Sequence, residues 1–468
     1  MKKQGFLRIR PILLLLLFLF LVPGCATVPD VRSAIENSFH TGHPPQIVGA
    51  KGHLTPAESR EFLGGIKKRV ESTDILDRHT AVMELVGAAP LVKDNRTALL
   101  IDGARTYEAM FRAMANARDH IHFETFIIRD DEIGQKLADM LLRKRSEGVA
   151  VHLIYDSFGC IKTPESYFDR LRDGGVRVLE FNPVDPLKAG KNWRLVNRDH
   201  RKILIVDGKL AITGGVNVGS EYSSRFSGNR GRRKPGDTAW RDTDVQIEGP
   251  VVSEFQKLFL DTWRRQKGPD LPEREYFPSP ADKSDRHDLV RVVGSTPGDK
   301  NRLTYIMYIS AFLYARDSIH LTNAYFVPDK QTIDALTDAA KRGVDVKIIL
   351  PESTDTPMAL YAGHYHYTRL LEAGVKLYEH QSAVLHAKTA VIDGVWSTIG
   401  SANMDMWSFA RNDEVNTVIL SREFADQMEE MFARDLAESA EILPAEWKNR
   451  PIGNRLREWF GHLFRHWL

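Results

Sequence analysis

Cysteine is almost absent from this chain, which has only Cys25 and Cys160 among its 468 residues. A framework of several disulfides is therefore excluded. Net charge is also low: 64 Lys and Arg residues against 62 Asp and Glu residues give +2. That value is too small to indicate nucleic-acid binding by itself. The hydrophobic content of 43% is that of a soluble body, and the length predicts two domains of ordinary size.

Long apolar runs are scarce too. One covers residues 12–22, follows four basic residues within positions 2–10, and is too short for a comfortable membrane span. The box Val22-Pro23-Gly24-Cys25 resembles a bacterial lipoprotein cleavage site. It implies a signal peptide over 1–24, a lipid on Cys25, and a membrane-anchored protein that faces the periplasm or the exterior; an uncleaved anchor is the alternative. Ala26, rather than Asp, implies the outer membrane where the host has one.

Two short stretches share the pattern H-x-K-x4-D-x6-G-[GS]-x-N. The first copy has His200, Lys202, Asp207 and Asn217, and the second has His386, Lys388, Asp393 and Asn403. One His-x-Lys would indicate little, because a surface or core histidine is the commoner explanation. Two copies with every spacing kept predict a functional pair of half-sites, and the alternative is two structural strands without catalysis.

The residue types in the motif suit a phosphodiester. The aliphatic runs at 203–206 and 390–392 predict buried strands, with His and Lys on one face and Asp on the other. An imidazole can attack phosphorus or donate a proton, while an ammonium neutralises the non-bridging oxygens. Asn217 and Asn403 follow Gly-rich turns and are expected to add amide donors to the same phosphate. Asp207 and Asp393 are expected to orient structure rather than to carry protons.

The duplication extends beyond the motifs. Residues 117–122, 148–154 and 175–178 recur in similar form as 315–320, 343–349 and 374–377. Each half then reads helix, strand, helix, strand, helix, strand and motif strand, with amphipathic helices at 133–145 and 332–341, which predicts a layered α/β fold. The predicted order begins with an N-terminal region over 25–94, which comprises a polar tether to about residue 60 and a helical region. Half one follows over 95–268, a linker over 269–288, half two over 289–445, and an amphipathic helix over 446–468.

Two carboxylates downstream of the motifs are candidates to hold the far nitrogen of each imidazole. Such a partner would fix the tautomer and favour the charged form of the ring. Aligning residues 241–245 with residues 411–415 selects Asp244 and Glu414 as these partners. The alternative is that both are ordinary strand-edge carboxylates.

The paired motif resembles that of the phospholipase D superfamily over about residues 95–440. The resemblance implies two fused α/β domains, related by a pseudo-twofold axis, that share one active site. It also implies a phosphohistidine intermediate and no metal or other cofactor, since two Lys and two Asn supply the positive field. It suggests His200 as nucleophile and His386 as acid, although the residues alone leave the two roles open.

Several phrases resemble the cardiolipin synthase branch of that superfamily: 197–202, 214–222, 240–243, 401–405 and 414–416. The resemblance implies phosphatidyl transfer that makes cardiolipin from phosphatidylglycerol and a second phospholipid, with phosphatidylethanolamine as a candidate. The expected partners are membrane phospholipids and the membrane surface, with no nucleic acid and no obligate protein partner. Trp407 departs from the branch at a usually basic position, which leaves the acceptor open. The alternatives are a phospholipase D hydrolase, another phosphodiesterase or nuclease, and a non-catalytic lipid-binding lipoprotein.

Two peripheral segments are also candidates for lipid contact. The surplus loop over 223–240 could hold an anionic headgroup or be only a mobile Gly-rich loop; its basic residues are Arg225, Arg230, Arg232, Arg233 and Lys234. Near the other end, an apolar stripe at helical spacing comprises Leu456, Trp459, Phe460, Leu463, Phe464, Trp467 and Leu468. It predicts either a helix at the membrane interface or a helix packed on the core by the same stripe.

Overall fold

The computed structural model describes residues 28–36, 45–68, 74–185, 187–188, 196–223, 239–279, 287–299 and 301–467. The predicted signal peptide, Cys25 and the five basic residues of the loop over 223–240 lie outside these residues. In the described part of the chain, no helix is both long and apolar enough to cross a bilayer.

The first half is a mixed sheet with the strand order β6-β5-β4-β8-β9-β11-β3. Its strands are β3 (Leu91–Ile101), β4 (His120–Thr125), β5 (Ala150–Asp156), β6 (Arg177–Phe181), β8 (Ile203–Val206), β9 (Leu210–Gly214) and β11 (Thr243–Glu248). Its helices are α5 (Asp102–Ala115), α6 (Glu132–Ser146), α7 (Glu165–Asp173) and α8 (Val252–Arg265). β4 to β6 run parallel, and the motif strand β8 is antiparallel to β4.

The second half repeats this order as β15-β14-β13-β17-β18-β19-β12. Its strands are β12 (Asp288–Ser295), β13 (Ser318–Asn323), β14 (Asp345–Pro351), β15 (Lys376–His380), β17 (Lys388–Ile392), β18 (Trp396–Gly400) and β19 (Asn412–Leu420), with β20 (Ser439–Glu441) beside β15. Its helices are α9 (Leu303–Tyr314), α10 (Lys330–Lys341), α11 (Pro357–Glu372), α12 (Met406–Ala410) and α13 (Arg422–Ala437). The predicted pair of α/β halves is confirmed.

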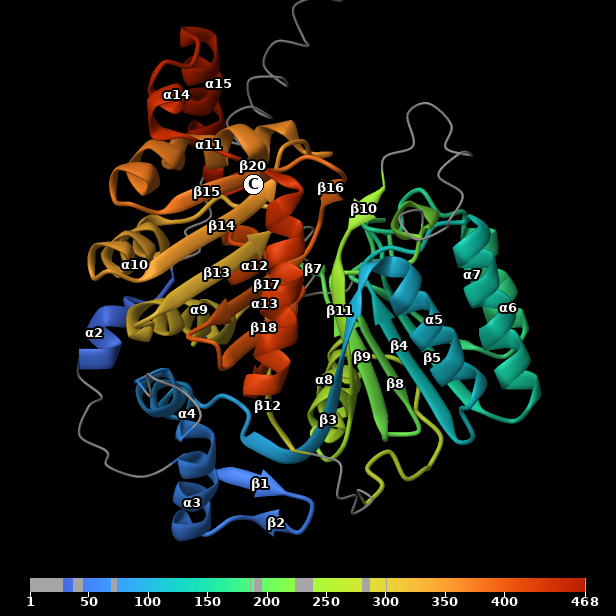
Figure 1. Ribbon diagram of the computed structural model, residues 1–468. Helices are drawn as coiled ribbons and strands as arrows, with labels where there is room; N and C mark the ends of the chain where they lie inside the picture. The colour runs from blue at the N-terminus through green and yellow to red at the C-terminus, as the bar shows by residue number, and fades with distance from the viewer. Residues whose placement is uncertain are drawn as a thin grey trace, which may run out of the picture.

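The halves are joined through their sheets and through a shared core. β3 pairs with β11 on one side and with β12 on the other, so the two sheets are continuous. Helices α8 and α13 lie in the middle of the molecule (Figure 1), and their apolar faces contribute Phe255, Phe259, Phe424 and Met428 to one buried cluster. Side chains of both motif strands, β8 and β17, belong to the same cluster.

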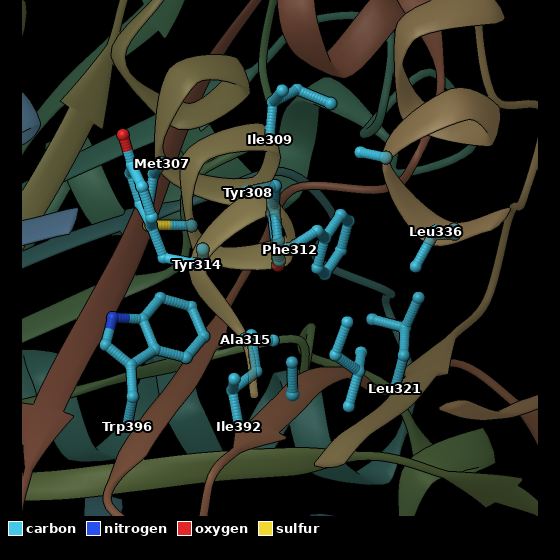
Figure 2. Packing of buried hydrophobic residues seen from close by; sticks show 14 of the residues in the cluster. Met307, Tyr308, Ile309, Phe312, Tyr314, Ala315, Leu321, Leu336, Ile392 and Trp396 are labelled. Carbon is cyan, nitrogen blue, oxygen red and sulfur yellow. The ribbon is translucent and has the colours of Figure 1, made fainter. Parts of the chain in front are cut away.

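Each half also has its own apolar core. Figure 2 shows Met307, Tyr308 and Phe312 of α9 among side chains from the second sheet, including Leu321 and Trp396. α9 is apolar nearly all round, which matches its burial between that sheet and the N-terminal helices.

The N-terminal region is folded where a tether was predicted, beginning with α2 (Val31–Glu36), whose Val31 is buried. It also contains β1 (Ile47–Gly49), β2 (Gly52–His53), α3 (Pro56–Lys67), the π-helical turn η1 (Ile75–His79) and α4 (Thr80–Leu85). β1 pairs with β3, and Ile47 and Leu63 are buried in the apolar core of the second half. The helix α3 begins where it does because Thr55 and Glu58 form a capping box around Pro56.

The end of the described chain forms a small helical layer. α14 (Pro444–Lys448) and α15 (Ile452–Leu463) pack on the outside of α11 (Figure 1). The short 3₁₀ turn η3 (Arg465–Trp467) contacts α12. The described residues of the predicted linker are 269–279, 287 and 288, and of these only Asp288, the first residue of β12, belongs to a helix or strand.

Candidate active site

The motif histidines lie where the two halves exchange short strands. β7 (Arg198–Asp199) runs parallel to the start of β19, and the His200 N–H donates to the Asp413 carbonyl at 2.9 Å. In the reciprocal arrangement, β16 (Val384–Leu385) pairs with β10 (Trp240–Arg241), and the His386 N–H donates to the Arg241 carbonyl at 2.8 Å. The backbone of each half therefore fixes the histidine of the other half, and both histidines are buried.

Each imidazole also meets a carboxylate from the opposite half. The His200 Nδ1 lies 3.1 Å from Glu414 Oε2, and the His386 Nδ1 lies 2.7 Å from Asp242 Oδ2. The structure thus places Glu414 where the sequence predicted a partner. The prediction for Asp244 was wrong, because Asp242 takes that place and Asp244 accepts the Val216 backbone N–H at 3.0 Å.

The prediction of Asp244 failed because the two halves were aligned two residues out of register. Asp244 pairs with Gly214 of β9, whereas Asn416 pairs with Gly400 of β18, and the two glycines are equivalent in the motifs. Asp242 is therefore the counterpart of Glu414. Shifting an alignment by two residues leaves every side chain on the same face of a strand, so the alternation of the sequence could not reveal the misalignment.

Burial and the carboxylates set the charge state of the site. Burial lowers the pKa of His200, and burial together with Lys388 and Lys202 lowers the pKa of His386 well below its ordinary value. Both rings are therefore neutral at neutral pH before substrate binds. Because each Nδ1 faces a carboxylate, it carries the proton and donates, which leaves the lone pair on Nε2 for chemistry.

The two carboxylates differ in their acidity. Burial acts to raise the pKa of Glu414, but His200 and the Ser401 hydroxyl outweigh it and lower that pKa to about 2. Burial raises the pKa of Asp242 to about 6, with Lys388 opposing the rise. Glu414 is thus a permanent anion beside His200, whereas Asp242 can be protonated in mildly acidic solution.

The motif lysines fold back on their own histidines. The Lys202 Nζ donates to the His200 carbonyl at 2.6 Å, and the Lys388 Nζ donates to the His386 carbonyl. Burial lowers the pKa of Lys202 to about 7 and that of Lys388 to about 8. An anionic phosphodiester would favour the charged form of both ammonium groups, so the site gains positive field as such a ligand enters.

The motif aspartates lie in hairpin turns, in agreement with the structural role predicted for them. Asp207 and Asp393 have φ of 53° and 51°, and each is followed by a glycine with positive φ, the pattern of a type I′ turn. The Asp207 Oδ1 accepts the Asp119 N–H at 2.8 Å, and the Asp393 Oδ1 accepts the Asp317 N–H at 2.8 Å. Each carboxylate therefore ties its motif hairpin to the start of the neighbouring strand, β4 or β13.

The motif asparagines are buried beside the loops that follow β9 and β18. The Asn217 Nδ2 donates to the Tyr222 hydroxyl at 2.9 Å, and its Oδ1 accepts the Ile127 N–H at 3.2 Å. The Asn403 Oδ1 has no hydrogen-bond partner among the described residues. Donation of these amides to a phosphate stays a prediction.

Aromatic rings that the sequence reasoning missed surround the histidines. The centroid of Phe126 lies 5.0 Å from that of His200, and Trp240, Tyr222 and Tyr325 lie 5.0, 5.8 and 6.2 Å from His386. Phe126 and Tyr325 stand one and two residues after β4 and β13, so an aromatic just beyond a predicted strand was the available signal. The rings exclude water and strengthen electrostatic interactions at the site.

Two buried arginines lock the halves together around the histidines. Arg201, the variable residue inside the first motif, donates from Nη2 to the Ser295 carbonyl at 2.9 Å and from Nε to the Glu414 carbonyl at 3.2 Å. Arg241 makes a two-point ion pair with Asp435 of α13, at 2.9 and 2.7 Å. The site geometry therefore depends on the interface between the halves.

Comparison with known proteins agrees with this geometry. A domain family described as "Cardiolipin synthase, PLD-like domain" matches residues 110–229 and 308–436, one match in each half. A cardiolipin synthase of a Geobacillus species is 33% identical over 403 residues, which cover 85% of this chain and 78% of that protein. The chain belongs to the cardiolipin synthase branch of the phospholipase D superfamily. Cardiolipin synthase 2 of Bacillus cereus is 34% identical over 80% of this chain and 71% of its own length.

A solved structure extends the comparison to the fold. The phosphatidylserine synthase of Haemophilus influenzae Rd KW20 superposes with a TM-score of 0.62 at 14% identity, covering 82% of this chain and 98% of that one. At that identity the likeness concerns the fold alone. The prediction of a phospholipase D-type phosphatidyltransferase is confirmed by the family and by the cardiolipin synthase relatives.

Proposed function

We propose that this member of the family transfers phosphatidyl groups between membrane phospholipids through a phosphohistidine. The observation that supports it is the crossed arrangement of two neutral histidines, each held through Nδ1 by a carboxylate of the other half. Two such rings on either side of one phosphodiester can share the work of attack and protonation.

In the first step, the Nε2 lone pair of His200 attacks the phosphorus of a phospholipid. The new N–P bond replaces the P–O bond to the departing alcohol, and Lys202 and Lys388 stabilise the charge that develops on the non-bridging oxygens. Glu414 suits His200 to this role, because a permanent anion at Nδ1 stabilises the positive charge of the phosphorylated ring.

His386 acts as the acid that protonates the departing alcohol. Its pKa is held low by burial and then by the two lysines, and the negative charge of a bound phosphodiester offsets the lysines. Substrate binding therefore favours uptake of the proton that His386 then donates. In the second step the neutral His386 takes the proton of an acceptor alcohol, whose oxygen attacks phosphorus and breaks the N–P bond.

Cardiolipin forms when phosphatidylglycerol supplies the acceptor hydroxyl and a second phospholipid, such as phosphatidylglycerol or phosphatidylethanolamine, supplies the phosphatidyl group. To test this, the purified full-length chain is incubated with labelled phosphatidylglycerol in mixed micelles, with and without a chelator. We expect cardiolipin and free glycerol as products under both conditions. Phosphatidic acid as the main product would instead indicate hydrolysis, and no turnover with native folding would indicate a lipid-binding protein.

We also propose that Cys25 carries the lipid that anchors the enzyme outside the cytoplasm. The support is the sequence alone: a basic, then apolar segment that ends in a lipoprotein-like box. A phosphatidyl exchange between finished lipids needs no nucleotide-activated donor, so it is compatible with that location. Intact mass and acyl labelling of wild type and Cys25→Ser test the proposal; an unlabelled wild-type chain that keeps residues 1–24 would contradict it.

A further inference from the structure

The helix α15 presents its apolar side to solvent, while Glu458, Gly461 and His462 face the protein. Ile452, Leu456 and Trp459 are 75%, 62% and 55% exposed, and Phe460, Leu463 and Phe464 continue the same stripe. The spacing of these residues places them on one face of a helix. Of the two alternatives for this stripe, packing on the core is contradicted for residues 452–464, because the core contacts the opposite face; Leu468 lies outside the described residues.

Three residues fix the face of α15 that points inward. Glu458 is buried and makes a two-point ion pair with Arg450, both distances being 2.6 Å. Gly461 lies against the backbone of α11, where an added Cβ would come within 2.8 Å of the Ala362 nitrogen. The His462 ring stacks on Tyr365 at 3.7 Å. These contacts fix the rotation of α15, so the exposed stripe is a property of the folded protein.

Cationic groups flank this stripe. Arg455 and Arg457 are exposed on either side of it on the helix surface. At its C-terminal end a cleft of about 750 Å³ opens between α15, α10 and α11. The charged and titratable side chains that line the cleft are Lys330, His366, Arg369, His462, Arg465 and His466, with the acids Asp329 and Glu372.

The charges inside the cleft largely offset one another. Lys330 and Arg369 both form ion pairs with Asp334, and Asp329 and Glu372 add negative charge. Burial, followed by His462 and Arg465, lowers the pKa of His366 to about 4, so that ring is neutral at pH 7. The positive charge that complements an anionic surface is therefore that of the arginines beside the stripe.

We propose that the outer face of α15, with the arginines beside it, docks the protein on a bilayer that contains anionic phospholipid. Trp, Phe and Leu on one face with Arg along both edges is the chemistry of a helix that lies in the membrane interface. A second copy of the chain fits less well, because a twofold pairing of two stripes would set the same arginines against each other. The inference is independent of which lipid the His200–His386 site uses.

The position of this docking surface suits the active site. Val327 and Met406 line the cleft, and the Val327 N–H donates to the Met404 carbonyl at 2.9 Å. These residues adjoin Tyr325 and Asn403, which belong to the second half-site. Docking through α15 would therefore bring the bilayer to the side of the molecule that carries the second motif.

The first test uses an environment-sensitive fluorophore on the full-length chain. The label is placed on Phe460→Cys and, as a matched control, on Phe277→Cys, in a Cys25→Ser background; both phenylalanines are 48% exposed. We expect a blue shift at position 460, and none at 277, when vesicles of phosphatidylcholine and phosphatidylglycerol are added. No shift at 460, or a shift without vesicles that rises with protein concentration, would overturn the proposal; the latter would indicate a second copy.

The second test separates docking from catalysis. The variant Leu456→Ser/Trp459→Ser/Phe460→Ser is compared with Phe277→Ser on vesicles and on a short-chain phospholipid dissolved as monomers. We expect the triple variant to need about tenfold more vesicle surface for half-maximal rate, with unchanged turnover of the soluble substrate. Unchanged vesicle dependence would overturn the docking inference, whereas loss of both activities in wild type would count against the proposed function instead.

Discussion

Replacing Glu414 by glutamine should remove the fixed anion beside His200 while keeping a side chain of the same shape. The pKa of Glu414 is lowered from 4.5 to about 2 in this buried position. That difference corresponds to about 3 kcal/mol in favour of the carboxylate, or roughly a 10²-fold effect on any state that depends on it. Because the positive charge on His200 develops as the N–P bond forms, we expect kcat to fall by about that factor.

The assay is single-turnover formation of the phosphoenzyme, followed by steady-state kcat. The matched control is Glu429→Gln, which alters another His–Glu pair of the second half, 2.6 Å from the His320 Nδ1, without touching the motifs. We expect the control to keep wild-type kinetics. A Glu414→Gln enzyme that forms the adduct at the wild-type rate would show that the carboxylate only packs, and our account of His200 would be wrong.

The pH dependence of this pair has a definite sign. Glu414 has a depressed pKa, so its contribution to stability is present above the unfolded value near 4.5 and is lost as pH falls through about 2. Between pH 5 and 9 the carboxylate stays ionised. A change in activity within that range must therefore come from another group.

Three further predictions follow from the site. Asp242→Asn should lower kcat by about 10²-fold. It should also remove the acidic limb that we expect for wild type near pH 6, where Asp242 becomes protonated, whereas Asp244→Asn should leave that limb in place; a pH–rate profile of both variants decides it. His386→Ala should lose about 10³-fold or more in kcat with natural lipids. It should still form the phosphohistidine on His200 from a substrate whose leaving group needs no proton, and absence of that phosphohistidine would reassign the nucleophile and acid roles. Arg241→Ala leaves Asp435 buried without its two-point partner and should cost about 3–5 kcal/mol of unfolding free energy, measured in urea; a variant as stable as wild type would show that this pair does not lock the halves.

The sequence by itself determined the motif residues, the two α/β halves and the order of their elements. These features are local: the run Ile203–Val206 forms a buried strand in any context that covers both faces, and Asp207–Gly208 suits a tight turn between strands. Because the same local signals occur twice at matching spacing, the pairing of the halves followed as well. The hairpin turn itself was also readable from Asp-Gly, although it was not predicted.

Only the tertiary structure decided which groups meet. His200 and Glu414 are 214 residues apart in sequence, and His386 and Asp242 are 144 apart. Strand periodicity restricts a carboxylate to a face of the sheet but not to a position along it, which is why Asp242 and Asp244 could not be told apart. The stripe on α15 posed the same kind of question. Its period defines an apolar face, but Gly461 and the Arg450–Glu458 pair turn that face away from the core, and such contacts exist only once α15 lies against α11.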